Sequence, residues 1–134
     1  MLASWQDGLV KMHVLKRALT ARTANPDLFL DGEYLPLEIR GQHKDRVIAI
    51  ARKNGNEWAI SVSPRCVASV QAPVIGADER REFWKQTELI LPNGAPATWA
   101  NALAGKAAAM SSGAGRLSVG AAFEGFPLAL LQPA

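Results

Sequence analysis

Two apolar-rich segments separated by a polar turn dominate the pattern between residues 46 and 63. The second segment alternates, with Trp58, Ile60 and Val62 on one side and polar or small residues on the other. The first segment, 47–51, is apolar on both sides. Asn54-Gly55 between them is typical of a two-residue hairpin turn. We therefore predict a central strand covered on both faces, followed by a strand with one face in solvent.

Apolar residues recur at helical spacing near the N-terminus and predict one substantial helix from residue 4 to about residue 24. Pro26 would end this helix, because proline disfavours helical conformation in the residue before it. Residues 28–31 are expected to form a short apolar connector. The apolar face of the helix is built from Leu9, Met12, Leu15 and Leu19.

The rest of the chain alternates short apolar segments with Pro/Gly turns. Residues 77–85 are charged and predict a single helical turn. Roughly seven or eight short strands predict a mainly β protein, an antiparallel β-sandwich preceded by one N-terminal helix. Besides the hairpin, the predicted strands are 34–39, 87–91, 98–103, 116–122 and 127–131.

Composition and charge exclude several classes of protein. The chain has 134 residues and a net charge of +3, with basic residues spread along it rather than clustered, so no nucleic-acid partner is expected. No apolar run approaches the ~20 residues that span a membrane, and the N-terminus lacks the pattern of a signal peptide. Cys66 is the only cysteine, which fits a reducing compartment. We expect a cytoplasmic protein with no membrane partner.

No motif for catalysis is present. The two histidines, His13 and His43, lie in different predicted elements, and a zinc site would need further ligands, so no metal or other cofactor is expected. His13 is interpreted as a helix residue at the edge of a packed face, His43 as solvated, and Cys66 as a small buried hydrophobe. The clustered carboxylates are interpreted as solvated charges: Asp27, Asp31, Glu33 and Glu38.

Aromatic rings are the best candidates for a sugar-binding surface, because their apolar faces suit pyranose rings. Trp84 lies among charged residues and Trp5 lies at the very start of the predicted helix, so these two, with Tyr34, are the candidate sugar-stacking residues. Packing in the core or in an interface is the alternative for each of them. Trp58 and Trp99 alternate with apolar residues and are expected in the core.

Several segments together resemble a known family. They are DGLVKM at 7–12 with RAL at 17–19, PDLF at 26–29, GEYLPL at 32–37, WAISVSPR at 58–65 and FPLALL at 126–131. In order and spacing they resemble the C-terminal part of maltooligosyltrehalose synthase, a glucosylmutase of the α-amylase clan. The resemblance implies that residues 1–25 are the last helix of a (β/α)₈ barrel and that residues 26–134 are the C-terminal antiparallel β-domain.

The same resemblance implies what the parent enzyme does. It converts the reducing-end α-1,4 bond of a maltooligosaccharide to an α,α-1,1 bond, a step in trehalose biosynthesis. The family's catalytic carboxylates lie on upstream barrel strands and match no position here, so this chain alone is expected to be non-catalytic. Its expected role is to stabilise the barrel and shape the substrate cleft.

The resemblance also makes the apolar helix face a candidate interface. Without the barrel, this face must pack on the β-domain or on a second copy of the chain, because large apolar patches rarely stay exposed. Two alternative functions remain open: an independent carbohydrate-binding module that binds maltooligosaccharide, and a protein-interaction domain without a sugar role.

Overall fold

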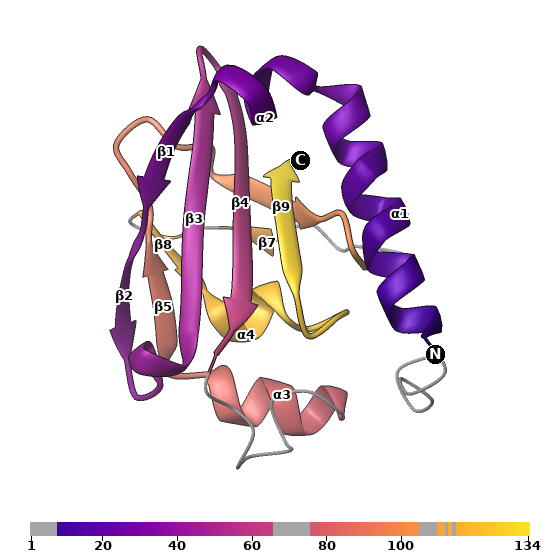
Figure 1. The fold of residues 1–134 in the computed structure, drawn as a ribbon. Coiled ribbons are helices and arrows are strands. Elements are labelled where there is room, and N and C mark those ends of the chain that lie inside the picture. The colour runs from indigo at the N-terminus through magenta and orange to yellow at the C-terminus, as the bar shows by residue number, and fades with distance from the viewer. Residues whose placement is uncertain (1–7, 66–75, 105–109, 112, 114) are drawn as a thin grey trace.

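The computed structural model describes residues 8–65, 76–104, 110–111, 113 and 115–134. Its described part is mainly β, with two antiparallel sheets packed against each other and a long helix at the N-terminal side (Figure 1). The larger sheet has six strands and the smaller has three, and neither closes into a barrel. The predicted sandwich-like fold is therefore confirmed.

The larger sheet has the strand order β1-β3-β4-β9-β6-β7, and the smaller has the order β2-β5-β8. The strands of the larger sheet are β1 (Glu33–Pro36), β3 (Val47–Asn54), β4 (Glu57–Pro64), β9 (Ala129–Pro133), β6 (Thr98–Asn101) and β7 (Met110–Ser111). Those of the smaller sheet are β2 (Glu38–Gly41), β5 (Thr87–Ile90) and β8 (Arg116–Ser118). The helices are α1 (Leu9–Ala24), α2 (Pro26–Asp31), η2 (Lys44–Arg46), α3 (Ala77–Trp84) and α4 (Val119–Ala122).

The predicted hairpin forms the centre of the larger sheet. Strands β3 and β4 pair antiparallel from Val47↔Pro64 to Asn54↔Glu57. The two turn residues are therefore Gly55 and Asn56, one position later than the predicted Asn54-Gly55 turn. Gly55 has a φ of 62°, in the left-handed region that glycine adopts without a steric penalty. The glycine thus occupies the first position of the turn rather than the second.

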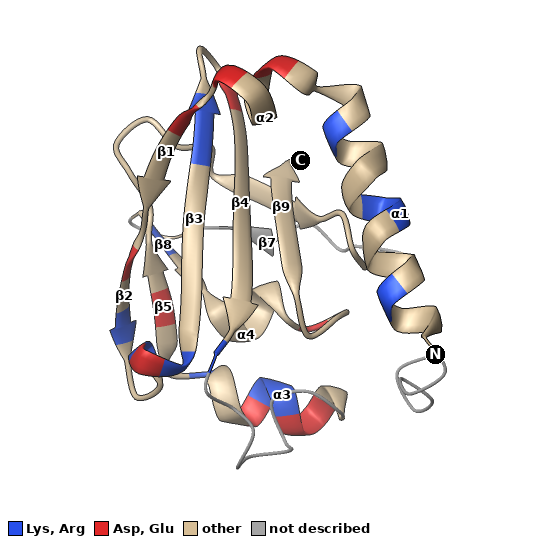
Figure 2. Cartoon of the chain, viewed as in Figure 1, with Lys and Arg blue, Asp and Glu red and all other residues tan. Residues whose placement is uncertain are grey.

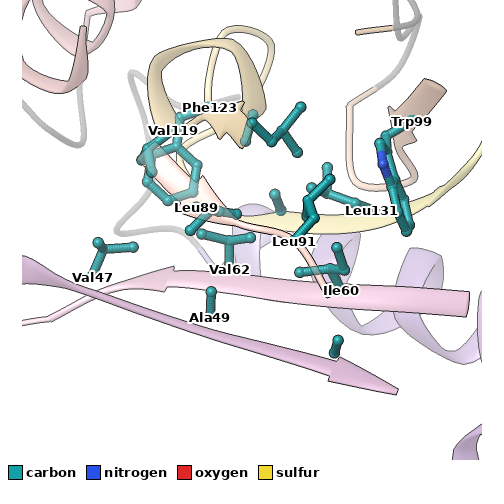
Figure 3. Packing of buried hydrophobic residues seen from close by; sticks show 14 of the residues in the cluster. Val47, Ala49, Ile60, Val62, Leu89, Leu91, Trp99, Val119, Phe123 and Leu131 are labelled. Carbon is teal, nitrogen blue, oxygen red and sulfur yellow. The ribbon is translucent and has the colours of Figure 1, made fainter. Parts of the chain in front are cut away.

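The main hydrophobic core lies between the two sheets (Figure 3). Strand β4 contributes Trp58, Ile60 and Val62, as predicted from its alternation. Strand β3 contributes only one of its faces to this core, and Ile48 on the other face remains 43% exposed. The prediction of a strand covered on both sides is therefore wrong at this position. The buried side chains labelled in Figure 3 are Val47, Ala49, Ile60, Val62, Leu89, Leu91, Trp99, Val119, Phe123 and Leu131.

A second cluster attaches the N-terminal helices to the larger sheet. Ala59 of β4 and Leu130 of β9 belong to it, on the sheet face opposite the main core. Leu28 from α2 and Ala21 from α1 pack on this face. Residues 28–31 are thus part of a short helix rather than a connector, since Pro26 occupies a first-turn position where its missing N–H costs nothing.

Other expected boundaries change for local reasons. The predicted strand at 34–39 is two strands in different sheets, and the chain crosses between them at Leu37, whose N–H donates to the carbonyl of Ala49. Residues 119–122 form helix α4 instead of extending a strand, because the Ser118 hydroxyl caps the helix by accepting from the Ala121 N–H. The C-terminal strand begins at Ala129, two residues later than predicted. The 77–85 segment forms eight residues of helix α3, longer than the expected single turn.

Candidate functional site

The three candidate sugar-stacking residues differ in how the structure places them. Trp84 has no exposed surface and packs edge-on against Phe83 and Phe123, with ring centroids 4.7 and 5.4 Å away. The prediction that Trp84 is an exposed platform is therefore wrong, because α3 directs this ring and the side chain of Arg80 into the interior, while its other charged residues are exposed. Trp5 lies outside the described residues. Trp58 and Trp99 are buried, as predicted.

Of the two candidates within the described residues, Tyr34 is accessible, with 58% of its surface exposed. It lies on β1 and lines a cleft of about 260 Å³ on the outer face of the larger sheet, beside α2. The other described lining residues come from α2, β3, β4 and β9. They are Phe29, Ile50, Arg52, Ala59, Ser61 and Leu130.

Arg52 contacts two other lining residues of this cleft, Tyr34 and Phe29. It is the cross-strand neighbour of Tyr34, and its guanidinium carbon lies 5.7 Å from the centre of the tyrosine ring. One terminal nitrogen donates a 2.6 Å hydrogen bond to the carbonyl oxygen of Phe29. Arg52 thereby connects the sheet to the end of α2.

Helix α1 has two apolar faces. The face toward the β-domain carries Ala21, which is buried, and the partly buried Val10, Val14 and Ala18. With about 3.6 residues per turn, the predicted apolar face lies on the opposite side of the helix. We call this second face the outer stripe; it consists of Leu9, Met12, Leu15 and Leu19.

The outer stripe is exposed along its whole length. The exposed fractions of its side chains run from 51% for Leu15 to 67% for Met12. Of the two expected coverings of this face, packing on the β-domain is wrong, because the small and β-branched residues of the opposite face fill that contact. Its coverage by another polypeptide stays a prediction.

The histidines serve packing in the described structure. The Nε2–H of His13 donates a 2.7 Å hydrogen bond to the carbonyl of Leu103, and its ring lies 5.3 Å from that of Phe126, as expected for the edge of a packed face. His43 was expected to be solvated, but its ring stacks on Phe83 at 3.8 Å with an interplanar angle of 5°. Burial, with a smaller contribution from the nearby charge of Arg46, lowers the pKa of His43.

The carboxylates near the N-terminal helices lie at the surface. The four carboxylates interpreted as solvated are all exposed, which confirms that interpretation: Asp27, Asp31, Glu33 and Glu38. Within the described ranges, no three His, Cys, Asp or Glu side chains are grouped so that they could hold a metal ion. Cys66 lies outside those ranges. None of the described helices is long and apolar enough to cross a membrane.

Comparison with known proteins identifies no relative. No protein-family model matches the chain, no curated protein matches it, and no solved structure matches it.

Proposed function

We propose that this chain is the non-catalytic C-terminal domain of a maltooligosyltrehalose synthase, with α1 as the last helix of the enzyme's barrel. The observation that carries the proposal is the pair of opposite apolar faces on α1. One face is packed on the β-domain, and the side chains of the outer stripe are more than half exposed. A helix that is apolar on both sides normally lies between two packed layers, which is the position of a last barrel helix followed by a β-domain.

In this proposal the reaction belongs to the rest of the enzyme. The parent enzyme is an isomerase that moves a glucosyl bond within a maltooligosaccharide, and its catalytic carboxylates come from barrel strands that precede this chain. The domain contributes by covering the barrel and shaping the substrate cleft. A cytoplasmic location is part of the same proposal and is supported by the single cysteine.

The partner of the outer stripe is the catalytic barrel. Full burial of a Leu or Met side chain contributes roughly 1.5–3 kcal/mol, so covering four of them provides a substantial driving force for association. In the absence of the barrel, a second copy of the chain is the available partner for the same face, and we propose weak self-association through it.

Co-expression tests this proposal. The partner is the catalytic part of a maltooligosyltrehalose synthase, cut before its last barrel helix, and the readout is conversion of maltopentaose to the trehalosyl product. We expect activity with the wild-type chain and its loss with Leu15→Glu, which places a charge in the outer stripe. Thr20→Glu introduces the same charge at an exposed position beside the stripe and should retain activity. If no variant, including the wild type, yields activity or a soluble complex, the proposal fails.

A carbohydrate-binding module is the second candidate, and the exposed Tyr34 ring is the observation that favours it. Titration with maltopentaose, followed by NMR, tests it on the isolated chain. Loss of binding in Tyr34→Ala would support this candidate. An unchanged spectrum at high sugar concentration would leave the scaffold role as the better account.

A further inference from the structure

The cleft beside Tyr34 has the composition of a small-ligand site. Most of its described lining is apolar or aromatic, with few polar groups, which is typical of pockets that bind organic molecules. Its volume of about 260 Å³ limits the ligand to a small molecule or a short side chain. The middle lengths of β4 and β9, which form part of its floor, carry no charged residues (Figure 2). Arg52 is the one charged residue in the described lining.

The guanidinium of Arg52 has spare donors. An arginine side chain offers five N–H groups and no acceptor. In the described structure, Arg52 uses one of them for the Phe29 carbonyl. Its Nε–H is shielded from solvent and has no acceptor among the described residues. None of the ion pairs between described residues includes Arg52, so its positive charge has no carboxylate counter-ion there.

The polar groups of the cleft favour a ligand group that accepts hydrogen bonds. Besides Arg52, the described lining offers the hydroxyls of Tyr34 and Ser61, and it contains no carboxylate or side-chain amide. A sugar presents both donors and acceptors and usually requires both from its site, whereas a carboxylate only accepts hydrogen bonds. A partly enclosed guanidinium forms its strongest hydrogen bonds with such an anion.

We infer that this cleft binds a small monocarboxylate, with the acid group hydrogen-bonded to the guanidinium of Arg52 and the apolar body against Tyr34 and Leu130. The shared chemistry is a carboxylate on an apolar body, supplied by a free organic acid or by an acidic side chain between apolar residues of a peptide. This inference does not rest on the proposed barrel-domain role, since the outer stripe is a different surface.

A matched pair of ligands tests the inference on the wild-type chain. Phenylacetate and phenylacetamide have nearly the same shape, but only the first carries a carboxylate. We expect phenylacetate to shift the NMR signals of the Arg52 Nε–H and of β3. The amide should bind about tenfold more weakly, because its neutral oxygen accepts a weaker hydrogen bond from the guanidinium than a carboxylate does.

Variants locate the site. Arg52→Gln should abolish the preference for the acid. Lys53→Gln removes a positive charge one residue further along β3 and should keep the preference, because the Lys53 ammonium lies over the Trp58 ring, 5.1 Å from its centre, toward the other face of the sheet. Since the acid–amide comparison uses the wild-type chain, it remains informative even if Arg52→Gln fails to fold.

A capped Leu-Glu-Leu peptide, compared with phenylacetate, distinguishes the two sources of the carboxylate. Tighter binding of the peptide than of phenylacetate identifies a polypeptide ligand, and the reverse identifies a free acid. Equal binding of acid and amide, absence of binding at high millimolar concentration, or an unchanged preference in Arg52→Gln would overturn the inference. Maltopentaose binding in this cleft that survives Arg52→Gln would also overturn it, in favour of a sugar site.

Discussion

The Nε2 atom of His13 lies 2.7 Å from the carbonyl oxygen of Leu103, ninety positions further along the chain. This hydrogen bond joins the second turn of α1 to the turn that follows β6. It is accompanied by the contact between the His13 and Phe126 rings. Together they hold the inner face of α1 on the β-domain, which leaves the outer stripe facing away from it.

Replacing His13 by Ala should loosen this attachment. The variant loses a hydrogen bond and a ring contact, so we expect the free energy of unfolding to fall by about 1–2 kcal/mol. Hydrogen exchange of α1 amides should increase more than that of β3 amides. Lys16→Ala, at an exposed position of the same helix, is the control and should change neither quantity. Unchanged exchange in His13→Ala would show that the helix is held by other contacts.

Asn101 is a buried polar residue whose side chain satisfies four backbone groups. Its amide nitrogen donates to the carbonyls of Ala122 and Leu128, and its oxygen accepts from the N–H groups of Leu103 and Leu130. Asn101→Leu would leave these groups unpaired in the interior. Since each unpaired group costs roughly 1–3 kcal/mol, we expect a loss of at least about 3 kcal/mol of stability.

Urea denaturation measures this loss. Asn93→Leu, at an exposed loop position, is the matched control and should stay close to wild type. A loss below about 1 kcal/mol for Asn101→Leu would mean that the freed backbone groups find other partners or reach water.

His43 should make the stability depend on pH. Its pKa is lowered in the folded protein, so the unfolded chain takes up a proton at a higher pH than the folded one. The free energy of unfolding should therefore decrease as the pH falls below 6.5, the ordinary value for histidine, and level off below the folded-state pKa. Well above 6.5 both states are neutral at this site, and the effect is absent.

Thermal unfolding between pH 5 and 8 tests this dependence, in the range where histidine titrates. His43→Phe keeps a ring that can stack on Phe83 but removes the titration, so its stability should fall less on acidification than that of the wild type. An identical pH profile for the two proteins would assign the dependence to other groups.

The parts of the fold that could be predicted are those where the sequence has a clear local pattern. The alternation of Trp58, Ile60 and Val62 identified the buried face of β4, because burial of one sheet face imposes a two-residue period. The exact turn at Gly55 and Asn56 was missed, since both Asn-Gly and Gly-Asn fit a two-residue hairpin and the cross-strand register decides between them. Helix α4 was missed because its short apolar sequence has no distinctive period.

The candidate sites were less predictable, because they depend on contacts between distant segments. Charged neighbours of Trp84 in the sequence suggested exposure, but α3 buries the Trp84 ring, and one of those neighbours, Arg80, is buried on the same side of the helix. The sequence around Arg52 did not mark it as a binding residue. Its position beside Tyr34 follows from the pairing register of β1 and β3. The outer stripe was identified correctly as an apolar face, whereas the second apolar face of α1 is built from Val and Ala and was overlooked.

Sedimentation velocity tests the central claim, that the outer stripe of α1 is an interface, most directly. The wild-type chain should self-associate as its concentration rises, and it should form a complex with the catalytic part of a maltooligosyltrehalose synthase that lacks this region. Leu15→Glu should weaken both associations, and Thr20→Glu should leave both intact. A strictly monomeric wild-type chain that forms no such complex, or associations that Leu15→Glu leaves unchanged, would contradict the claim.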